Sequence, residues 1–168
     1  EEEEEEGLPI AAPEELITAA INGNADKVAA CLRNPLIKPN MTGEFGRTTL
    51  SFAASGGHAK VVKILLVDKR ANPNATDVNG NTALMGAANC CHLDVVRLLL
   101  SDKRTDPNII AGDSDEQWTA LGGATSVCPK AKNRNNHKKV IQHYWVTRLL
   151  LADDRITRSR PTPNSIYP

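Results

Sequence analysis

One stretch of the chain repeats itself at a spacing of about 34 residues. The segment from Gly46 to Asn74 returns as the segment from Gly80 to Asn108. A fixed period of this length predicts a stacked array, in which each unit buries its apolar face only against its neighbours. The recurring residues of the first copy are Gly46, Thr48, Leu50, Ala53, Ala54, His58, Val61, Val62, Leu65, Leu66, Asp68, Lys69, Arg70, Pro73 and Asn74.

Both copies contain the same two-part motif. The first part reads Thr-Thr-Leu-Ser-Phe-Ala-Ala over 48–54 and Thr-Ala-Leu-Met-Gly-Ala-Ala over 82–88. The second part, Gly-His-x-x-Val-Val-x-x-Leu-Leu, runs over 57–66 and is followed by Pro73-Asn74. This register resembles the ankyrin repeat, whose first helix opens with Thr-Pro-Leu-His-x-Ala-Ala. The resemblance implies an all-α solenoid of about four stacked helix-turn-helix units with short β-hairpin-like loops.

The same register predicts the boundaries of the units. We expect an acidic flexible lead over 1–12, an ankyrin repeat array over 13–157 and a C-terminal tail over 158–168. The four units span about 13–40, 41–74, 75–108 and 109–157, and the last contains a basic insertion over 129–142 that the middle units lack.

Several motif residues have structural roles that require no function. The hydroxyls of Thr48, Thr82 and Thr119 are placed to accept a main-chain N–H at the start of a first helix. Gly56-Gly57 permits the left-handed backbone that ends such a helix. Cys90-Cys91 holds that place in the third unit, so we expect an altered or strained turn there.

Two departures from the family pattern stand out. Ser51, Met85 and Gly122 replace the usual histidine, which removes the hydroxyl-to-imidazole bond expected at the helix start. Asp68-Lys69-Arg70, repeated at 102–104 and echoed at 153–155, replaces the usual Gly-Ala. We interpret it as a helix-terminating loop whose cations favour the negative end of the helix dipole, with a binding role as the less favoured alternative.

The titratable residues predict neither a cofactor nor a metal. Cys31, Cys90, Cys91 and Cys128 have no metal-ligand spacing, so we expect reduced thiols. The histidines at 58, 92 and 143 share one register position, where we expect them to form hydrogen bonds at the start of the second helix. The sequence has no phosphate-binding loop, nucleophile elbow or helical zinc pair, and so predicts a protein that is not an enzyme.

The composition favours a folded module outside the membrane. The formal net charge is +0 and 40% of the residues are hydrophobic, whereas no apolar run approaches the ~20 residues of a membrane span. We expect a monomer in the cytoplasm or nucleus, or delivered into a host cell if it is an effector. Because the chain starts at Glu1 rather than Met, we expect a processed or excised piece.

Candidate partner-binding positions follow from the resemblance, since ankyrin arrays usually bind proteins with their hairpin tips and the concave face of their first helices. The tip positions are Glu44, Phe45, Arg47, Val78, Asn79, Asn81, Glu116 and Trp118. The helix-face positions are Phe52, Ser55, Asn89, Cys90, Ser126 and Val127. Phe45 and Trp118 are notable because aromatic residues make up only 4% of the chain and often dominate interface energies.

Charge is distributed unevenly along the chain. Residues 1–26 contain acids and no Lys or Arg, whereas the last quarter is mostly basic. The electric field of this charge distribution steers an acidic partner toward the fourth unit. The basic candidates in and near the insertion are Lys130, Lys132, Arg134, Lys138 and Lys139.

Two hypotheses remain. The first is a protein-protein interaction module, a scaffold or a pathogen-type effector that binds a host protein. The alternative is a binder of nucleic acid or another acidic ligand through the basic insertion and tail. Aromatic residues for base stacking are nearly absent from the basic stretch, so a protein partner is favoured.

Overall fold

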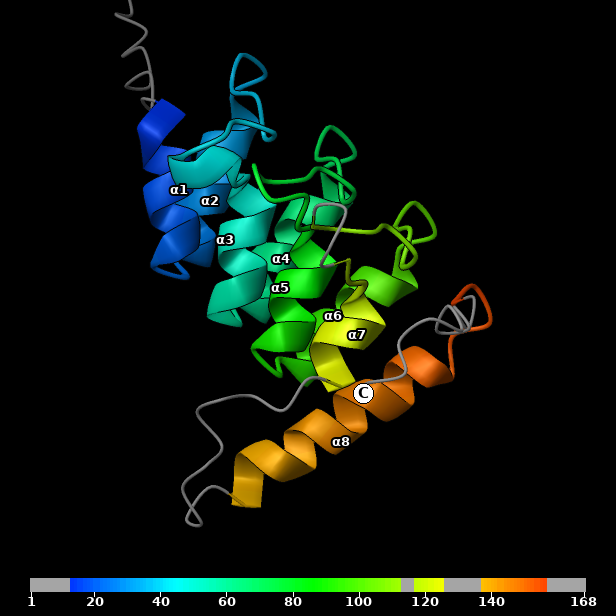
Figure 1. Ribbon diagram of the computed structural model, residues 1–168. Helices are drawn as coiled ribbons and strands as arrows, with labels where there is room; N and C mark the ends of the chain where they lie inside the picture. Colours follow the sequence, from blue (N-terminus) through cyan, green and yellow to red (C-terminus); the bar gives the residue numbers. More distant parts are fainter. Residues whose placement is uncertain (1–12, 113–116, 126–136, 157–168) are drawn as a thin grey trace, which may run out of the picture.

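A computed structural model describes residues 13–112, 117–125 and 137–156 as a row of helical pairs (Figure 1). The first two pairs are α1 (Pro13–Ile21) with α2 (Ala25–Arg33) and α3 (Thr49–Gly56) with α4 (Ala59–Val67). The last two pairs are α5 (Ala83–Asn89) with α6 (Leu93–Ser101) and α7 (Ala120–Thr125) with α8 (His137–Leu151). One 3-10 turn, η1 (Glu44–Gly46), lies in the loop before α3.

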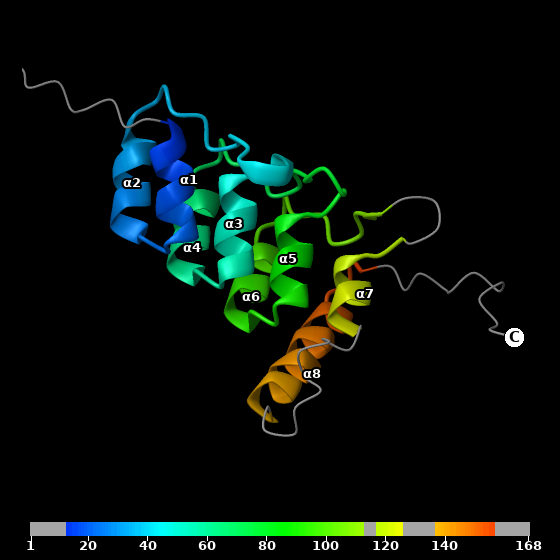
Figure 2. The same cartoon turned by 60° about the vertical axis from the view of Figure 1, so that its left-hand side comes forward.

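The helices form two layers, which Figure 2 shows from the side. The first helix of each pair contacts the first helix of the next pair, so that α1, α3, α5 and α7 form one layer. The second helices, α2, α4, α6 and α8, contact one another in the same order. This is the predicted all-α solenoid, with four units in the part of the chain that the structure describes.

The repeated apolar positions form one continuous core. Val61 and Val95, which occupy the same register position, are 0% and 1% exposed. Val146 of α8 is also fully buried. Alanines of the first helices, including Ala54 and Ala88, are fully buried between neighbouring units because their small side chains allow close packing.

The predicted threonine caps are confirmed in three units. The hydroxyls of Thr48, Thr82 and Thr119 accept the main-chain N–H of the third residue after them. Ser51 partly replaces the missing histidine, because its hydroxyl lies 3.1 Å from the hydroxyl of Thr48.

Backbone bonds between the loops keep the tips of neighbouring units in register. The N–H of Val78 donates to the carbonyl of Phe45 (3.0 Å), and the N–H of Gly112 donates to the carbonyl of Asn79 (3.1 Å). Isolated bridges, such as the one between Ala111 and Trp118, close individual loops. The described residues contain no strand, so the loops resemble hairpins without forming a sheet.

The Asp-Lys-Arg loops end their helices at Asp68 and Asp102, as predicted, and they also connect adjacent units. Each arginine reaches back to the C-terminal end of the second helix in the preceding unit, rather than to its own helix. Arg104 donates to the carbonyls of Leu66, Lys69 and Ala71 at 3.0–3.1 Å. Arg70 makes the same three contacts one unit earlier, and Arg155 donates to the carbonyls of Leu100 and Thr105.

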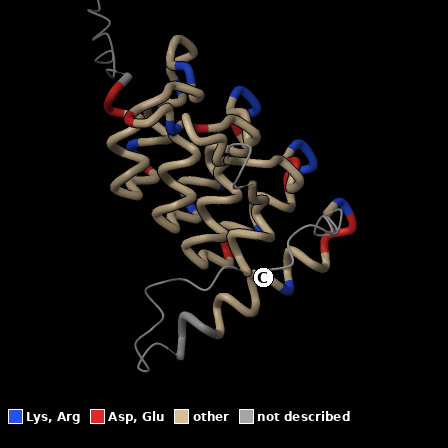
Figure 3. Tube along the Cα trace, in the orientation of Figure 1, with Lys and Arg blue, Asp and Glu red and all other residues tan. Residues whose placement is uncertain are grey.

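An aspartate fixes each of these guanidinium groups. Asp102 accepts from Arg104 at 2.6 Å, and Asp68 and Asp153 hold Arg70 and Arg155 in the same way. The bond from the arginine lowers the pKa of each aspartate. Figure 3 shows the pairs of basic and acidic residues recurring along one side of the stack. We call each Asp-Arg pair with its carbonyl contacts a clamp.

The histidine prediction is confirmed in two units and wrong in the fourth. His58 Nε2 lies 2.9 Å from the carbonyl of Ile21, and His92 Nε2 lies 3.0 Å from that of Ser55. His143 is not at a helix start, because α8 already begins at His137. Its Nε2 is buried and has no hydrogen-bond partner.

The turn before α6 differs from the equivalent turns of the first two units. Gly23 and Gly57 have positive φ and lie against the rings of His58 and His92, where a Cβ would come within 2.6 Å of a ring atom. The equivalent residue before His143 is Cys91, which adopts the same left-handed conformation with φ of 61°. A side chain therefore occupies the place that glycine leaves open in the earlier units, and the predicted strain at this turn is present.

Candidate functional site: a groove along the first-helix layer

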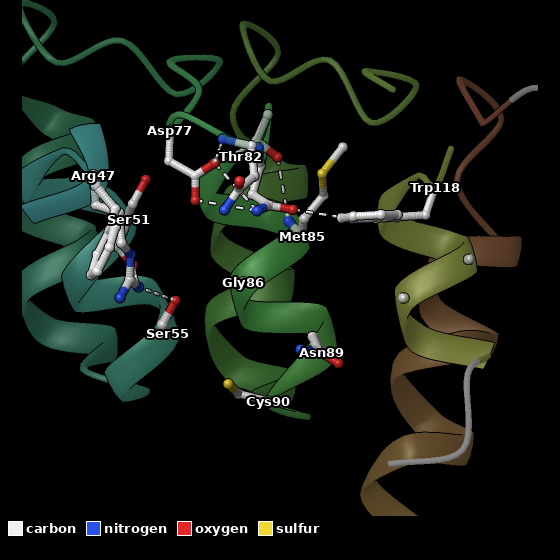
Figure 4. Close-up of a pocket in the computed structure, with 15 residues that line it drawn as sticks. Arg47, Ser51, Ser55, Asp77, Thr82, Met85, Gly86, Asn89, Cys90 and Trp118 are labelled. Atoms are coloured by element: carbon white, nitrogen blue, oxygen red, sulfur yellow. Dashed lines mark hydrogen bonds between the residues drawn. The ribbon is translucent and has the colours of Figure 1, made fainter. Parts of the chain in front are cut away.

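An open groove of about 620 Å³ runs across the second, third and fourth units (Figure 4). Its walls come from the loops before α3, α5 and α7, and its floor comes from the helices themselves. The lining residues are Phe45, Arg47, Ser51, Ser55, Asp77, Asn79, Asn81, Thr82, Met85, Gly86, Asn89, Cys90, Trp118, Gly122 and Gly123.

Arg47 forms one side of the groove. Its guanidinium donates to the hydroxyl of Ser55 (2.7 Å) and to the carbonyl of Ser51 (3.3 Å). The same group stacks over the ring of Phe52, with 4.5 Å between Cζ and the ring centroid. Arg47 is therefore held in position before any partner arrives, which reduces the entropy that binding must remove.

A hydrogen-bonded chain connects the third unit to the fourth. Asp77 accepts from the main-chain N–H groups of Asn79 and Asn81 and from the side-chain amide of Asn81. The carbonyl oxygen of that amide accepts from Nε1 of Trp118 at 3.1 Å. Figure 4 shows the indole of Trp118 extending from the fourth unit toward Met85. These bonds fix the orientation of the indole in the groove wall.

The floor depends on residues with little or no side chain. Gly86, Gly122 and Gly123 line the groove on α5 and α7. A Cβ at Gly86 would lie only 2.4 Å from Oγ of Ser55. Glycine at this position therefore lets the Ser55 hydroxyl, and the Arg47 group bonded to it, lie close to α5.

The groove is nearly neutral. Among the described residues that line it, Arg47 and Asp77 are the only charged ones. Asp77 is engaged by asparagine amides and main-chain N–H groups rather than by a cation. The remaining polar groups are amides and hydroxyls, which suit hydrogen bonds to a polypeptide backbone.

The structure gathers most of the described candidate residues at this groove. Phe45, Arg47, Ser55, Asn79, Asn81, Asn89, Cys90 and Trp118 line it. Phe52 lies behind Arg47 and contacts its guanidinium rather than lining the groove. Glu44 and Val78 are exposed on the loops and do not line it either.

Other candidates cannot be placed, and some lining residues were missed. Glu116, Ser126, Val127, Lys130, Lys132 and Arg134 lie outside the described residues. Lys138 and Lys139 lie in the first turn of α8, but their side chains are outside the described part.

The residues missed by the sequence analysis are Ser51, Asp77, Thr82, Met85, Gly86, Gly122 and Gly123. Three of them, Ser51, Met85 and Gly122, stand where the family pattern has histidine, and that departure was the available signal.

The fold is a repeat solenoid with a groove along its first-helix layer. The sequence pattern of the ankyrin repeats, in three copies, matches residues 16–111. The chain belongs to the ankyrin repeat family, whose repeats are generally protein-protein interaction modules and are typically not enzymes. The search of curated proteins found no match.

Most of the fourth unit lies beyond the matched range, but it keeps two of the contacts that recur in the earlier units. It has the threonine cap at Thr119 and the clamp formed by Asp153 and Arg155. Within the described ranges, no helix is long and apolar enough to cross a membrane. The same residues contain no cluster of three or more histidine, cysteine, aspartate or glutamate side chains suited to a metal ion.

Proposed function

We propose that the chain is a non-enzymatic scaffold or adaptor that binds another protein in the groove between Arg47 and Trp118. The observation that carries this proposal is the combination of a preformed groove with a nearly neutral lining of amides, hydroxyls and aromatic rings. Phe45, 71% exposed at the rim, and Trp118 in the wall supply the kind of side chain that contributes most to protein interfaces.

The lining favours a polypeptide over a nucleic acid. Nucleic-acid binding requires several cations that neutralise phosphates. The described lining of this groove contains one cation, Arg47, and its guanidinium already bonds to Ser51 and Ser55. The alternative acidic-ligand site would use the basic insertion and tail. A protein partner in the groove predicts a modest effect of salt on affinity, whereas phosphate binding predicts a steep one.

A matched pair of variants tests the groove. Asn89→Arg places a long side chain on an exposed position in the groove, and Asp94→Arg places the same side chain on an exposed outward position of α6 in the same unit. We expect proteins captured from a cell lysate by the wild-type chain to be lost with Asn89→Arg and retained with Asp94→Arg. Quantitative mass spectrometry of the captured proteins measures this difference.

A deletion of residues 129–136 combined with Lys138→Gln and Lys139→Gln removes the basic candidates, leaves α8 (His137–Leu151) intact and separates the two hypotheses. If the groove binds the partner, the deletion variant captures the same proteins as the wild type. Loss of the captured set on deletion, with Asn89→Arg unaffected, contradicts groove binding and favours the acidic-ligand alternative. An empty set from the wild-type chain contradicts the recognition function itself.

We also infer a reducing compartment, the cytoplasm or nucleus. Cys31 and Cys90 are free thiols among the described cysteines. The effector role predicted from sequence remains part of this proposal and is tested by the identity of the captured proteins.

A further inference from the structure

Arg47 is held in place as the clamp arginines are, but it lacks the acidic partner that they have. Each clamp arginine bonds to an aspartate at 2.6–2.7 Å. Arg47 instead donates from Nη2 to the hydroxyl of Ser55 and to the carbonyl of Ser51. In the described ranges, no Asp or Glu side chain forms an ion pair with it, and its Nε and Nη1 donate to no other described residue.

This cation is half-buried among neutral groups. The guanidinium stacks over the ring of Phe52, and Figure 4 shows it beside Ser55 at one side of the groove. A charge that has lost part of its water and has no counterion attracts a carboxylate more strongly than a fully exposed charge does. Because Arg47 lines the groove, a carboxylate that enters the groove meets a donor that is already positioned.

The acidic residue of the groove is already satisfied by its neighbours. Asp77 accepts from the main-chain N–H groups of Asn79 and Asn81 at 2.9 and 2.8 Å. Its two oxygens also accept from the side-chain amide of Asn81, at 3.2 Å each. These bonds stabilise its negative charge within the third unit. The described lining therefore combines a satisfied acid with an unpaired cation, and this charge complements a ligand with a negative side chain.

The rest of the lining suits a polypeptide that carries this negative charge, rather than a phosphate. Met85 and the indole of Trp118 form an apolar stretch on the opposite side of α5 from Arg47 (Figure 4). Asn89, which is exposed on the floor, adds a side-chain amide, and amides suit hydrogen bonds to a peptide backbone. Phosphates are usually bound by several cations, whereas the described lining has one.

We propose that the groove recognises an acidic segment of its partner, in which an aspartate or glutamate side chain binds Arg47. This inference rests on the function proposed above, because it names the chemistry of the segment that fills the same groove. The groove is an open channel across three units rather than a closed pocket. A chain end is therefore not required inside it, and we assign the carboxylate to a side chain rather than to a C-terminus.

A peptide selection with the full chain tests the proposal. The probe is a random library of peptides of about ten residues, which span about 33 Å when extended, each joined at its C-terminus to the particle that displays it. The library is selected on wild type and on Asn89→Arg, the variant that places a long side chain in the groove. We expect Asp or Glu to be enriched at one position in the peptides that wild type retains and Asn89→Arg does not.

A matched pair of arginine variants then tests whether the enriched acid binds Arg47. Arg47→Gln removes the positive charge from the groove, and Arg97→Gln removes the same charge from an exposed position on α6 outside it. We expect Arg47→Gln to weaken the binding of a selected acidic peptide about tenfold or more. Arg97→Gln should leave that affinity nearly unchanged. Fluorescence polarisation measures the affinities, and circular dichroism confirms that both variants remain folded.

A second peptide keeps the test independent of the folding of the variants. In this peptide, asparagine or glutamine replaces the enriched acid. We expect wild type to bind it about tenfold or more weakly than the acidic peptide. Wild type and Arg47→Gln should bind this amide peptide equally, because neither complex contains the ion pair.

The outcomes distinguish this inference from the proposed function. Peptides that require the groove but share no acidic position overturn the acidic segment and leave the groove as a peptide site. An acidic peptide whose affinity is unaffected by Arg47→Gln does the same. A selection in which wild type and Asn89→Arg retain the same peptides, or none, overturns the proposed function and this inference with it.

Two further results would assign Arg47 to a different occupant. Binding of a short oligothymidylate by wild type and its loss in Arg47→Gln, with no acidic peptide selected, overturns the proposal and identifies a nucleic acid. An acidic peptide that binds only after deletion of residues 1–6, the chain's own run of glutamates, overturns an external segment as the occupant and assigns the groove to that run.

Discussion

The guanidinium of Arg104 donates a 3.0 Å hydrogen bond to the main-chain carbonyl of Leu66, in the unit before its own. Leu66 lies in the last turn of α4, where carbonyls have no partner within the helix. Asp102 holds the other side of the same guanidinium at 2.6 Å. One side chain therefore ends the helix of one unit and connects it to the loop of the next, and the same contact recurs at Arg70 and Arg155.

Arg104→Ala should destabilise the array more than an ordinary surface substitution. The change leaves the carbonyls of Leu66, Lys69 and Ala71 without this donor and removes the ion pair with Asp102. We expect a loss of about 2 kcal/mol in the free energy of unfolding, the range typical for hydrogen bonds to a charged group. Arg104→Lys should recover only part of it, because an ammonium cannot reproduce the planar fork. Urea denaturation measures the loss.

Lys103→Ala is the control for this prediction. Lys103 is exposed and adjacent to Arg104, so its removal should change stability by less than about 0.5 kcal/mol. If the two alanine variants prove equally stable, the clamp does not contribute to stability.

The clamps also predict acid sensitivity. Hydrogen bonds from Arg70, Arg104 and Arg155 lower the pKa of their partner aspartates below the ordinary value of 3.8. A lowered folded-state pKa contributes stability that is present above the ordinary pKa and is lost as the pH falls through the folded value. We expect the melting temperature to fall as the pH drops below about 4.

Asp102→Asn isolates the contribution of one clamp. Asparagine cannot ionise, so this variant should be less stable than wild type at pH 6 and should lose less stability on acidification. Thermal melts followed by circular dichroism from neutral pH downward measure both effects. Parallel curves for the variant and the wild type would show that acid destabilisation comes from other groups.

The sequence predicted the elements whose causes are local and repeated. The threonine caps and the buried valines follow from a 34-residue period, because every unit presents the same residues to the same neighbours. The clamp could not be predicted in the same way. Asp68-Lys69-Arg70 shows that a cation follows the helix, but the carbonyl of Leu32, which Arg70 reaches, is 38 residues away in the sequence.

The position of the groove could be predicted from the sequence, but the contacts between its residues could not. Phe45 and Trp118 were selected because tips in this family face partners, and both line the groove. The bond between Trp118 and Asn81 joins loops 37 residues apart, and its geometry depends on the stacking of the units. The exposure of Tyr144 and Trp145 likewise depends on which side of α8 faces the array.

Trp118→Phe should reveal how much the hydrogen bond between Trp118 and Asn81 contributes to stability. Phenylalanine keeps an aromatic ring but lacks the Nε1 donor, so the carbonyl oxygen of Asn81 loses its partner at 3.1 Å. We expect a loss of about 1 kcal/mol in the free energy of unfolding. A double-mutant cycle with Asn81→Ala should give a coupling energy of about 0.5–1.5 kcal/mol. Additive effects of the two substitutions would show that this bond is not energetically significant.

Cys91→Gly should stabilise the protein. Cys91 has a φ of 61°, and left-handed backbone costs a non-glycine residue roughly 1–2 kcal/mol. Glycine recovers this strain but makes the unfolded chain more flexible, so we expect a net gain of about 0.5–1 kcal/mol.

The reverse substitution provides the comparison for Cys91→Gly. Gly57→Ala introduces a Cβ 2.6 Å from Nδ1 of His92 at a residue with φ of 75°, so both strain and steric overlap should lower the stability. We expect a loss of more than about 1 kcal/mol in urea denaturation. The two variants should therefore shift the unfolding midpoint in opposite directions. A Cys91→Gly variant that is less stable than wild type would mean that the cysteine side chain contributes more through packing than its backbone conformation costs.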